Sequence, residues 1–190
     1  MALLTRADWR RQSRLAWACL GLVLLVAGCL WLLDRRGAAL GTLAAMAGCL
    51  GLILPPRERM AVLPGRLRRL PRRLDAAPVL ATLLSTPGYG LNWFHGANPY
   101  DEVVHLLSGI LAGAVLAGLL HTDGRPRPRG RLALLGLGFG LGLAVAWEAF
   151  EAATGLIGSA GDTVSDIVLT TAGAAFGNVW GAAPRRPAPG

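Results

Sequence analysis

Long uncharged runs alternate with short charged segments along most of the chain. Six runs consist almost entirely of apolar and small residues, at residues 15–33, 37–56, 76–100, 103–122, 132–150 and 167–183. Each approaches the ~20 residues that an α-helix needs to cross a bilayer core at about 1.5 Å per residue. The pattern therefore predicts an all-α fold, a polytopic transmembrane helical bundle that forms a single membrane domain over residues 1–190.

The third run, residues 76–100, is the least regular of the six. It contains Pro78, Pro87 and Pro99 together with three glycines, and a proline inside a helix removes a backbone hydrogen bond and kinks or breaks the helix. Hydropathy alone therefore leaves five crossings as an alternative to six. We expect this helix to be broken by proline and to end in a loop such as residues 90–99.

The distribution of arginine favours six crossings. All 19 basic residues are arginines, and cytoplasmic loops of membrane proteins collect Lys and Arg. Six crossings with the N-terminus inside place 17 arginines on the cytoplasmic side, in residues 1–14, 57–75, 124–131 and the tail. Five crossings would put the arginine-rich loop at 124–131 outside. We therefore predict six crossings with both termini cytoplasmic.

The net charge of +8 and the pI near 11.1 would suit a nucleic-acid partner. The arginines lie between apolar runs, however, and aromatic residues make up only 6% of the chain, so anionic membrane lipid is the expected partner and nucleic acid is not. Residues 1–14 form a basic cytoplasmic N-terminus, and residues 57–75 a basic amphipathic segment on the cytoplasmic leaflet. Residues 184–190 are expected to be a disordered tail.

Small residues and thiols are placed within the apolar runs. Glycines recur at four-residue spacing, which lets helix backbones approach closely and indicates a compact bundle or a homo-oligomer. The three cysteines, Cys19, Cys29 and Cys49, have neither metal-ligand spacing nor a loop position. We expect them to be buried apolar thiols.

The acids fall into two groups. Five lie among arginines, where solvated ion pairs are expected; they are Asp8, Asp34, Glu58, Asp75 and Asp123. Six have no arginine nearby and lie at the ends of the last three predicted helices; they are Asp101, Glu102, Glu148, Glu151, Asp162 and Asp166. In the six-crossing topology all six acids converge on the extracytoplasmic face, opposite the arginines.

Helical spacing brings several of these side chains together. Residues three or four apart share a helix face, and this spacing relates Asp101 to His105, Glu148 to Glu151, and Asp162 to Asp166. His105, Glu148 and Asp166 would lie about one turn inside the apolar region. Ionisable residues are costly there and by default mark a functional site.

So many carboxylates cannot all remain ionised without a counter-charge. A bound divalent metal, shared protons and a cationic partner are three ways to supply it. One His with several carboxylates suits Mg²⁺, Mn²⁺, Ca²⁺ or Zn²⁺, and Glu102, Thr163 and His95 are accessory candidates. In the alternative, the outermost acids cap helix ends, and only His105, Glu148 and Asp166 are buried, in interhelical hydrogen bonds.

A family resemblance rests on these same residues. Tyr100-Asp101-x-x-x-His105, Glu148-x-x-Glu151 and Gly161-Asp162-Thr163-x-x-Asp166 resemble the pattern of the uncharacterised bacterial inner-membrane family typified by YjdF. The pattern covers residues 93–177 and is more distantly similar to VanZ-like proteins. The resemblance implies a small multi-pass protein of the bacterial inner membrane with a loose link to the cell envelope, and it implies no mechanism.

Two functional hypotheses follow. In the first, the acidic site holds a divalent ion that polarises a phosphate or ester of an envelope or lipid-linked substrate. In the second, the chain is a non-enzymatic small transporter, a proton or cation carrier, or a membrane assembly factor that uses the same acids. The sequence contains no nucleophile motif that would decide between them.

Overall fold

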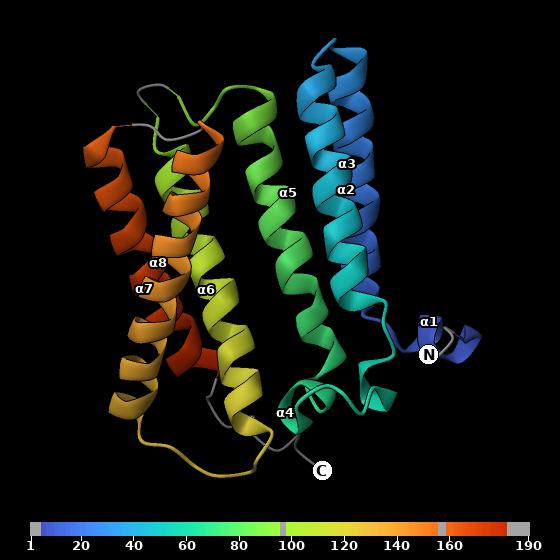
Figure 1. Ribbon diagram of the computed structural model, residues 1–190, viewed down its shortest axis with the longest axis vertical. Helices are drawn as coiled ribbons and strands as arrows, with labels where there is room; N and C mark the ends of the chain where they lie inside the picture. Colours follow the sequence, from blue (N-terminus) through green and yellow to red (C-terminus); the bar gives the residue numbers. More distant parts are fainter. Residues whose placement is uncertain (1–4, 96–97, 156–158, 182–190) are drawn as a thin grey trace, which may run out of the picture.

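The chain folds into long α-helices joined by short segments (Figure 1). The computed structural model describes residues 5–95, 98–155 and 159–181, and these residues contain no strand. The helices are α1 (Arg6–Arg11), α2 (Arg14–Leu32), α3 (Arg36–Ile53), η1 (Arg57–Arg59), α4 (Gly65–Arg68), η2 (Arg72–Asp75), α5 (Ala76–Gly90), α6 (Tyr100–His121), α7 (Arg129–Thr154) and α8 (Ala160–Gly181). The all-α prediction is confirmed for this part of the chain, whereas the predicted tail at 184–190 lies outside it.

In the part of the chain that the structure describes, the long helices α2, α3, α5, α6, α7 and α8 run side by side and alternate in direction (Figure 1). Helices α6, α7 and α8 pack as one group and α2, α3 and α5 as another, and contacts between α5 and α6 join the two groups. The basic segments at 57–75 and 122–131 lie at one end of the bundle, here called the basic end. The starts of α6 and α8 and the ends of α5 and α7 lie at the other, the acidic end.

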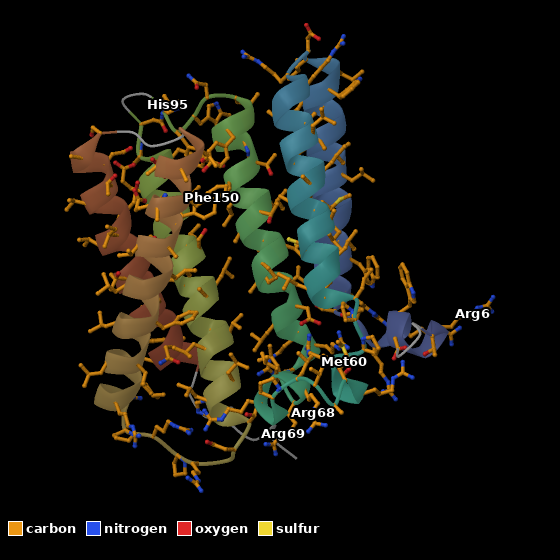
Figure 2. The ribbon with its side chains drawn as sticks, in the orientation of Figure 1. Arg6, Met60, Arg68, Arg69, His95 and Phe150 are labelled. Carbon is orange, nitrogen blue, oxygen red and sulfur yellow. The ribbon has the colours of Figure 1, made fainter. Side chains whose placement is uncertain are left out.

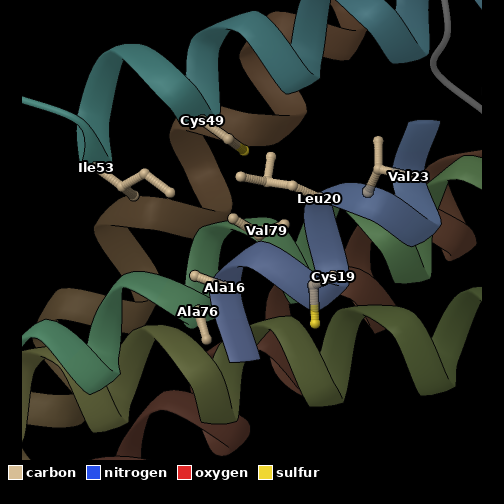
Figure 3. Packing of buried hydrophobic residues seen from close by; sticks show 8 residues of the cluster. All are labelled: Ala16, Cys19, Leu20, Val23, Cys49, Ile53, Ala76 and Val79. Atoms are coloured by element: carbon tan, nitrogen blue, oxygen red, sulfur yellow. The ribbon is translucent and has the colours of Figure 1, made fainter. Parts of the chain in front are cut away.

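The core of the α2–α3–α5 group is built from one face of α2. Ala16, Leu20 and Val23 recur at helical spacing and are almost fully buried, so this face packs on Cys49 of α3 and Val79 of α5 (Figure 3). Because lipid is as apolar as these side chains, the contacts stabilise the association of the helices by van der Waals packing.

The α6–α8 pair is packed backbone against backbone. A Cβ atom at Gly109 would collide with the Thr170 carbonyl, and one at Gly173 would collide with the Leu106 carbonyl. Only glycine permits helices to approach this closely. The close approach brings the first turns of α6 beside the first turns of α8, and the candidate site lies there.

Within the described residues, four helices are long and apolar enough to cross a membrane, namely α2, α3, α6 and α7. Helix α5 has 15 residues, a length of about 22 Å against a hydrocarbon core of ~30 Å. Helix α8 has 22 residues but carries Asp162, Asp166 and Asn178. Large apolar side chains such as Leu32, which is 86% exposed, cover the outside of the bundle, as expected for a surface that faces lipid.

The prediction of a break in the third helix is wrong. Helix α5 is continuous from Ala76 to Gly90 and contains Pro87. Pro78 lies in its first turn, where the backbone N–H has no partner within the helix and proline is tolerated. The helix does end at Gly90, where the expected loop begins.

The expectation of solvated ion pairs also needs correction at the basic end. Arg57 and Asp75 pair with side chains that are only 9% and 3% exposed, and Arg72 also contacts Asp75. Burial raises the pKa of Asp75 above its ordinary value, and the two guanidinium groups oppose that rise. These contacts hold the basic segment against the start of α5, because Asp75 directly precedes that helix.

One cysteine departs from expectation as well. Cys19 and Cys49 are buried, whereas Cys29 is exposed on the outer face of α2. Hydrophobicity alone does not distinguish a core-facing thiol from a lipid-facing one, because both environments are apolar.

The basic segment between α3 and α5 consists of three short helical pieces, η1, α4 and η2. Arg68 and Arg69 of this segment are labelled at the basic end in Figure 2.

Candidate metal centre at the acidic end of the bundle

Asp101, His105 and Asp166 form the centre of the site. Their potential ligand atoms all lie within 4.8 Å of one another. His105 Nε2 is 3.5 Å from Asp101 Oδ1 and 3.7 Å from Asp166 Oδ2. Two of these residues share a face of α6, and the third comes from α8, so the packing of α6 on α8 creates the cluster.

The other ring nitrogen of His105 has a partner of its own. Nδ1 lies 3.1 Å from the hydroxyl oxygen of Thr170, one turn after Asp166 on α8. In the tautomer protonated at Nδ1, the ring donates to Thr170 and leaves the Nε2 lone pair directed at the two carboxylates. Such an outer hydrogen bond is what orients histidine ligands in metal sites.

Asp166 is the most deeply placed acid of the cluster. Its side chain is only 5% exposed, and its Oδ1 atom is buried without a hydrogen-bond partner among the described residues. Buried carboxylate oxygens nearly always have a partner. The unpaired oxygen therefore points to a ligand that the protein atoms do not supply.

The remaining predicted acids surround this centre. Glu148 is buried on α7, and the charges of Asp162, Glu148 and Glu151 act on Asp166. Glu151 accepts a hydrogen bond of 2.8 Å from the Tyr89 hydroxyl of α5. None of these three acids belongs to the group of ligand atoms within 4.8 Å.

The accessory candidates lie farther out. Glu102 and His95 are exposed, and His95 is near the acidic end (Figure 2). Thr163 lies in the first turn of α8, which begins at Ala160 and where the Ser159 hydroxyl accepts the backbone N–H of Asp162.

Sequence reasoning missed Thr170 and Tyr89. Thr170 lies four residues after Asp166, so the spacing that relates Asp162 to Asp166 could have found it. Tyr89 had no such signal, because its partner Glu151 is 62 residues away along the chain. Asn178 was also missed; it is fully buried and donates to the Leu132 carbonyl of α7.

Fold and site together define a helical membrane protein with a histidine–carboxylate cluster at one end of its bundle. A family model described as "Predicted membrane protein (DUF2238)" matches residues 79–186, and the chain belongs to this family. The match includes every residue of the cluster, and YjdF is a member of the family. No curated protein and no solved structure matches the chain, and the resemblance to VanZ-like proteins stays an expectation.

Proposed function

We propose that this protein is a six-crossing protein of the bacterial inner membrane that binds a divalent metal ion at Asp101, His105 and Asp166. With this ion it acts on a lipid-linked or other envelope substrate at the extracytoplasmic face. The observation that carries the proposal is the convergence of three potential ligand atoms from two helices, together with the Oδ1 atom of Asp166, which is buried without a hydrogen-bond partner among the described residues.

The charges at the cluster favour a cation. Asp101 and Asp166 approach each other in the apolar part of the bundle, and Glu148, Glu151 and Asp162 add further negative charge. Among the described residues, no arginine forms an ion pair with any of these acids. A divalent ion would supply the missing positive charge and give the Nε2 lone pair of His105 an acceptor.

The geometry fits a small ion with mixed nitrogen and oxygen ligands. Ligands about 2.0–2.2 Å from a tetrahedral Zn²⁺ lie ~3.4 Å from one another, close to the 3.5 and 3.7 Å separations around His105 Nε2. Three protein ligands leave a coordination position open, as in catalytic rather than structural sites. We therefore expect the site to bind Zn²⁺, and Mn²⁺ is the second candidate.

An ion at this position would have a defined chemical role. It would polarise a phosphoryl or ester oxygen and stabilise negative charge that develops there. Because the cluster lies in the first turns of α6, near the membrane face, the reacting group would be the head of a membrane-anchored substrate. Glu148 is the nearest buried acid outside the ligand set and is the candidate for proton transfer.

The proposed topology follows from the two ends of the bundle. Most arginines gather at the basic end and the acids of the cluster, which have no arginine partner, at the acidic end, so the rule for Lys and Arg places the basic end in the cytoplasm. Helices α5 and α8 would then also cross the membrane. A phosphatase fused after Gly90 should be active and one fused after Asp123 inactive; the opposite pattern would contradict this orientation.

The test of the metal site is metal content in the full-length protein purified in detergent. We expect bound Zn²⁺ or Mn²⁺ in the parent and its loss in Asp166→Asn. Glu102→Gln is the matched control, because Glu102 is an exposed acid next to Asp101 but lies outside the ligand set, and it should retain the metal.

Absence of metal from the parent, together with no binding of added Zn²⁺ or Mn²⁺, would overturn the proposal. Proton or cation flux in liposomes that is lost in Asp166→Asn would then favour the carrier hypothesis. Equal metal content in the parent and in Asp166→Asn would mean that the ion lies elsewhere.

A further inference from the structure

A groove of about 610 Å³ runs along the bundle next to the proposed metal site. It is lined by residues of α3, α5, α6 and α7, together with Phe94 and with Thr170 of α8. Its volume lies within the ~300–1,000 Å³ of typical small-molecule sites. His105 belongs to the groove wall and to the metal site alike, so the two are continuous.

The groove has an apolar surface although several hydroxyl groups line it. None of its lining residues is Asp, Glu or Arg. On α5, Thr82, Ser85 and Thr86 each donate to the backbone carbonyl four residues earlier, and Thr42 of α3 does the same. These hydroxyl protons are not offered to a ligand, so the surface suits hydrocarbon better than a polar solute.

The length of the groove along the helices is close to the hydrocarbon thickness of one leaflet. Its lining runs from Gly37 to Ala45 on α3 and from Ala81 to Tyr89 on α5. Eight residues of helix correspond to about 12 Å, slightly less than half of the ~30 Å hydrocarbon core. The groove begins at the acidic end, where Phe150 of its α7 side is labelled in Figure 2.

Positive charge lies at the mouth of the groove. A second hollow contains Asp34, Arg35 and Arg36 and shares Gly37, Ala38 and Tyr89 with the groove. Arg36 pairs with Asp34 in an exposed contact, while Arg35 makes no ion pair within the described residues. An anionic headgroup is the complement to these guanidinium groups.

We propose that the groove binds one acyl chain of an anionic phospholipid from the leaflet at the acidic end, with its phosphate at Arg35 and Arg36. This inference rests on the proposed function in one respect: it identifies an anionic phospholipid as the lipid that binds beside the metal site, because His105 lines the groove that holds its acyl chain. The binding site itself is independent of the metal.

Gly41 gives a variant that fills the groove without disturbing the fold. A Cβ at Gly41 would have no atom within 4 Å, so Gly41→Leu places a side chain in the groove rather than in the protein. Gly48 lies on the same helix, equally has no neighbour within 4 Å, and does not line the groove. Gly48→Leu is therefore the matched control.

The experiment uses phosphatidylglycerol with a photoreactive group on one acyl chain, added to the full-length protein in nanodiscs. We expect cross-links to Trp147 and to residues of α5 that line the groove. Labelling there should be lost in Gly41→Leu and retained in Gly48→Leu. Arg35→Gln should weaken competition by unlabelled phosphatidylglycerol about tenfold, since one charge-assisted contact is removed.

Equal labelling of groove residues in the two leucine variants would overturn the inference. Displacement of the probe by a polyprenyl phosphate but not by phosphatidylglycerol would also overturn it, because the occupant would then be an isoprenoid lipid. Metal content, measured in the same samples, separates the two proposals. Metal without groove labelling contradicts the lipid site alone, and groove labelling without metal contradicts the metal site alone.

Discussion

The hydrogen bond between His105 and Thr170 gives the sharpest prediction about the metal site. Thr170→Val keeps the side-chain shape and the branching at Cβ but removes the hydroxyl that lies 3.1 Å from Nδ1. The ring then loses the contact that fixes its tautomer and its orientation toward Asp101 and Asp166. Loss of such a contact typically lowers metal affinity about 10- to 100-fold, or about 1.4–2.8 kcal/mol.

The assay is competition for Zn²⁺ between the detergent-purified protein and a chelating dye. Thr170→Ser should bind nearly as tightly as the parent, because it keeps the hydroxyl. Thr171→Val controls for the replacement of a threonine of α8 by valine. The Thr171 hydroxyl is buried without a partner among the described residues, so its removal should leave the affinity for Zn²⁺ unchanged.

Two results would refute this reasoning. Thr170→Val with the affinity of the parent, in a protein whose Asp166→Asn variant no longer binds, would show that Thr170 does not orient His105. Equal weakening by Thr170→Val and Thr171→Val would attribute the loss to the packing of α8 instead.

Two further predictions concern ion pairs of the protein outside the site. Asp75→Asn leaves the buried Arg57 without its charged partner and should lower the free energy of unfolding by about 3–5 kcal/mol, whereas Asp34→Asn, in a pair that is 69% and 82% exposed, should cost less than about 1 kcal/mol. Thermal unfolding in detergent compares them, and equal losses would contradict the difference in burial. The hydrogen bond from Arg72 holds the pKa of Glu58 below its ordinary value of 4.5. Its stabilisation is therefore present above pH 4.5 and lost as pH falls below it, so the unfolding temperatures of the parent and of Glu58→Gln should differ at neutral pH and converge in acid; a constant difference would contradict the linkage.

Several parts of the site follow from sequence spacing. The four-residue separation of Asp101 and His105 places them on one face of any helix, and the structure has them 3.5 Å apart. The apolar run around His105 and Asp166 likewise indicates that polar groups there carry a cost. These inferences need only the regular geometry of an α-helix, so one sequence is enough to make them.

Other parts depend on how helices pack. That Asp166 reaches His105 while Glu148 stays outside the ligand set depends on how α8 and α7 are rotated relative to α6. Helices α6 and α8 approach so closely because Gly109 and Gly173 have no Cβ atom; a Cβ at either position would collide with the facing backbone. Spacing within one helix carries no information about the rotation of another, because apolar interfaces of similar composition permit several registers.

The periodicity and charge pattern of the sequence by itself determined the all-α fold, the long apolar helices and the gathering toward one end of acids that have no arginine nearby. Only the tertiary structure decided which acids meet His105, that Asp166 keeps a buried oxygen without a partner, and that a groove between α3 and α7 leads to the same place. The reason is physical: helix geometry and hydropathy act locally along the chain, whereas a ligand set and a groove arise from contacts between residues that lie tens of positions apart.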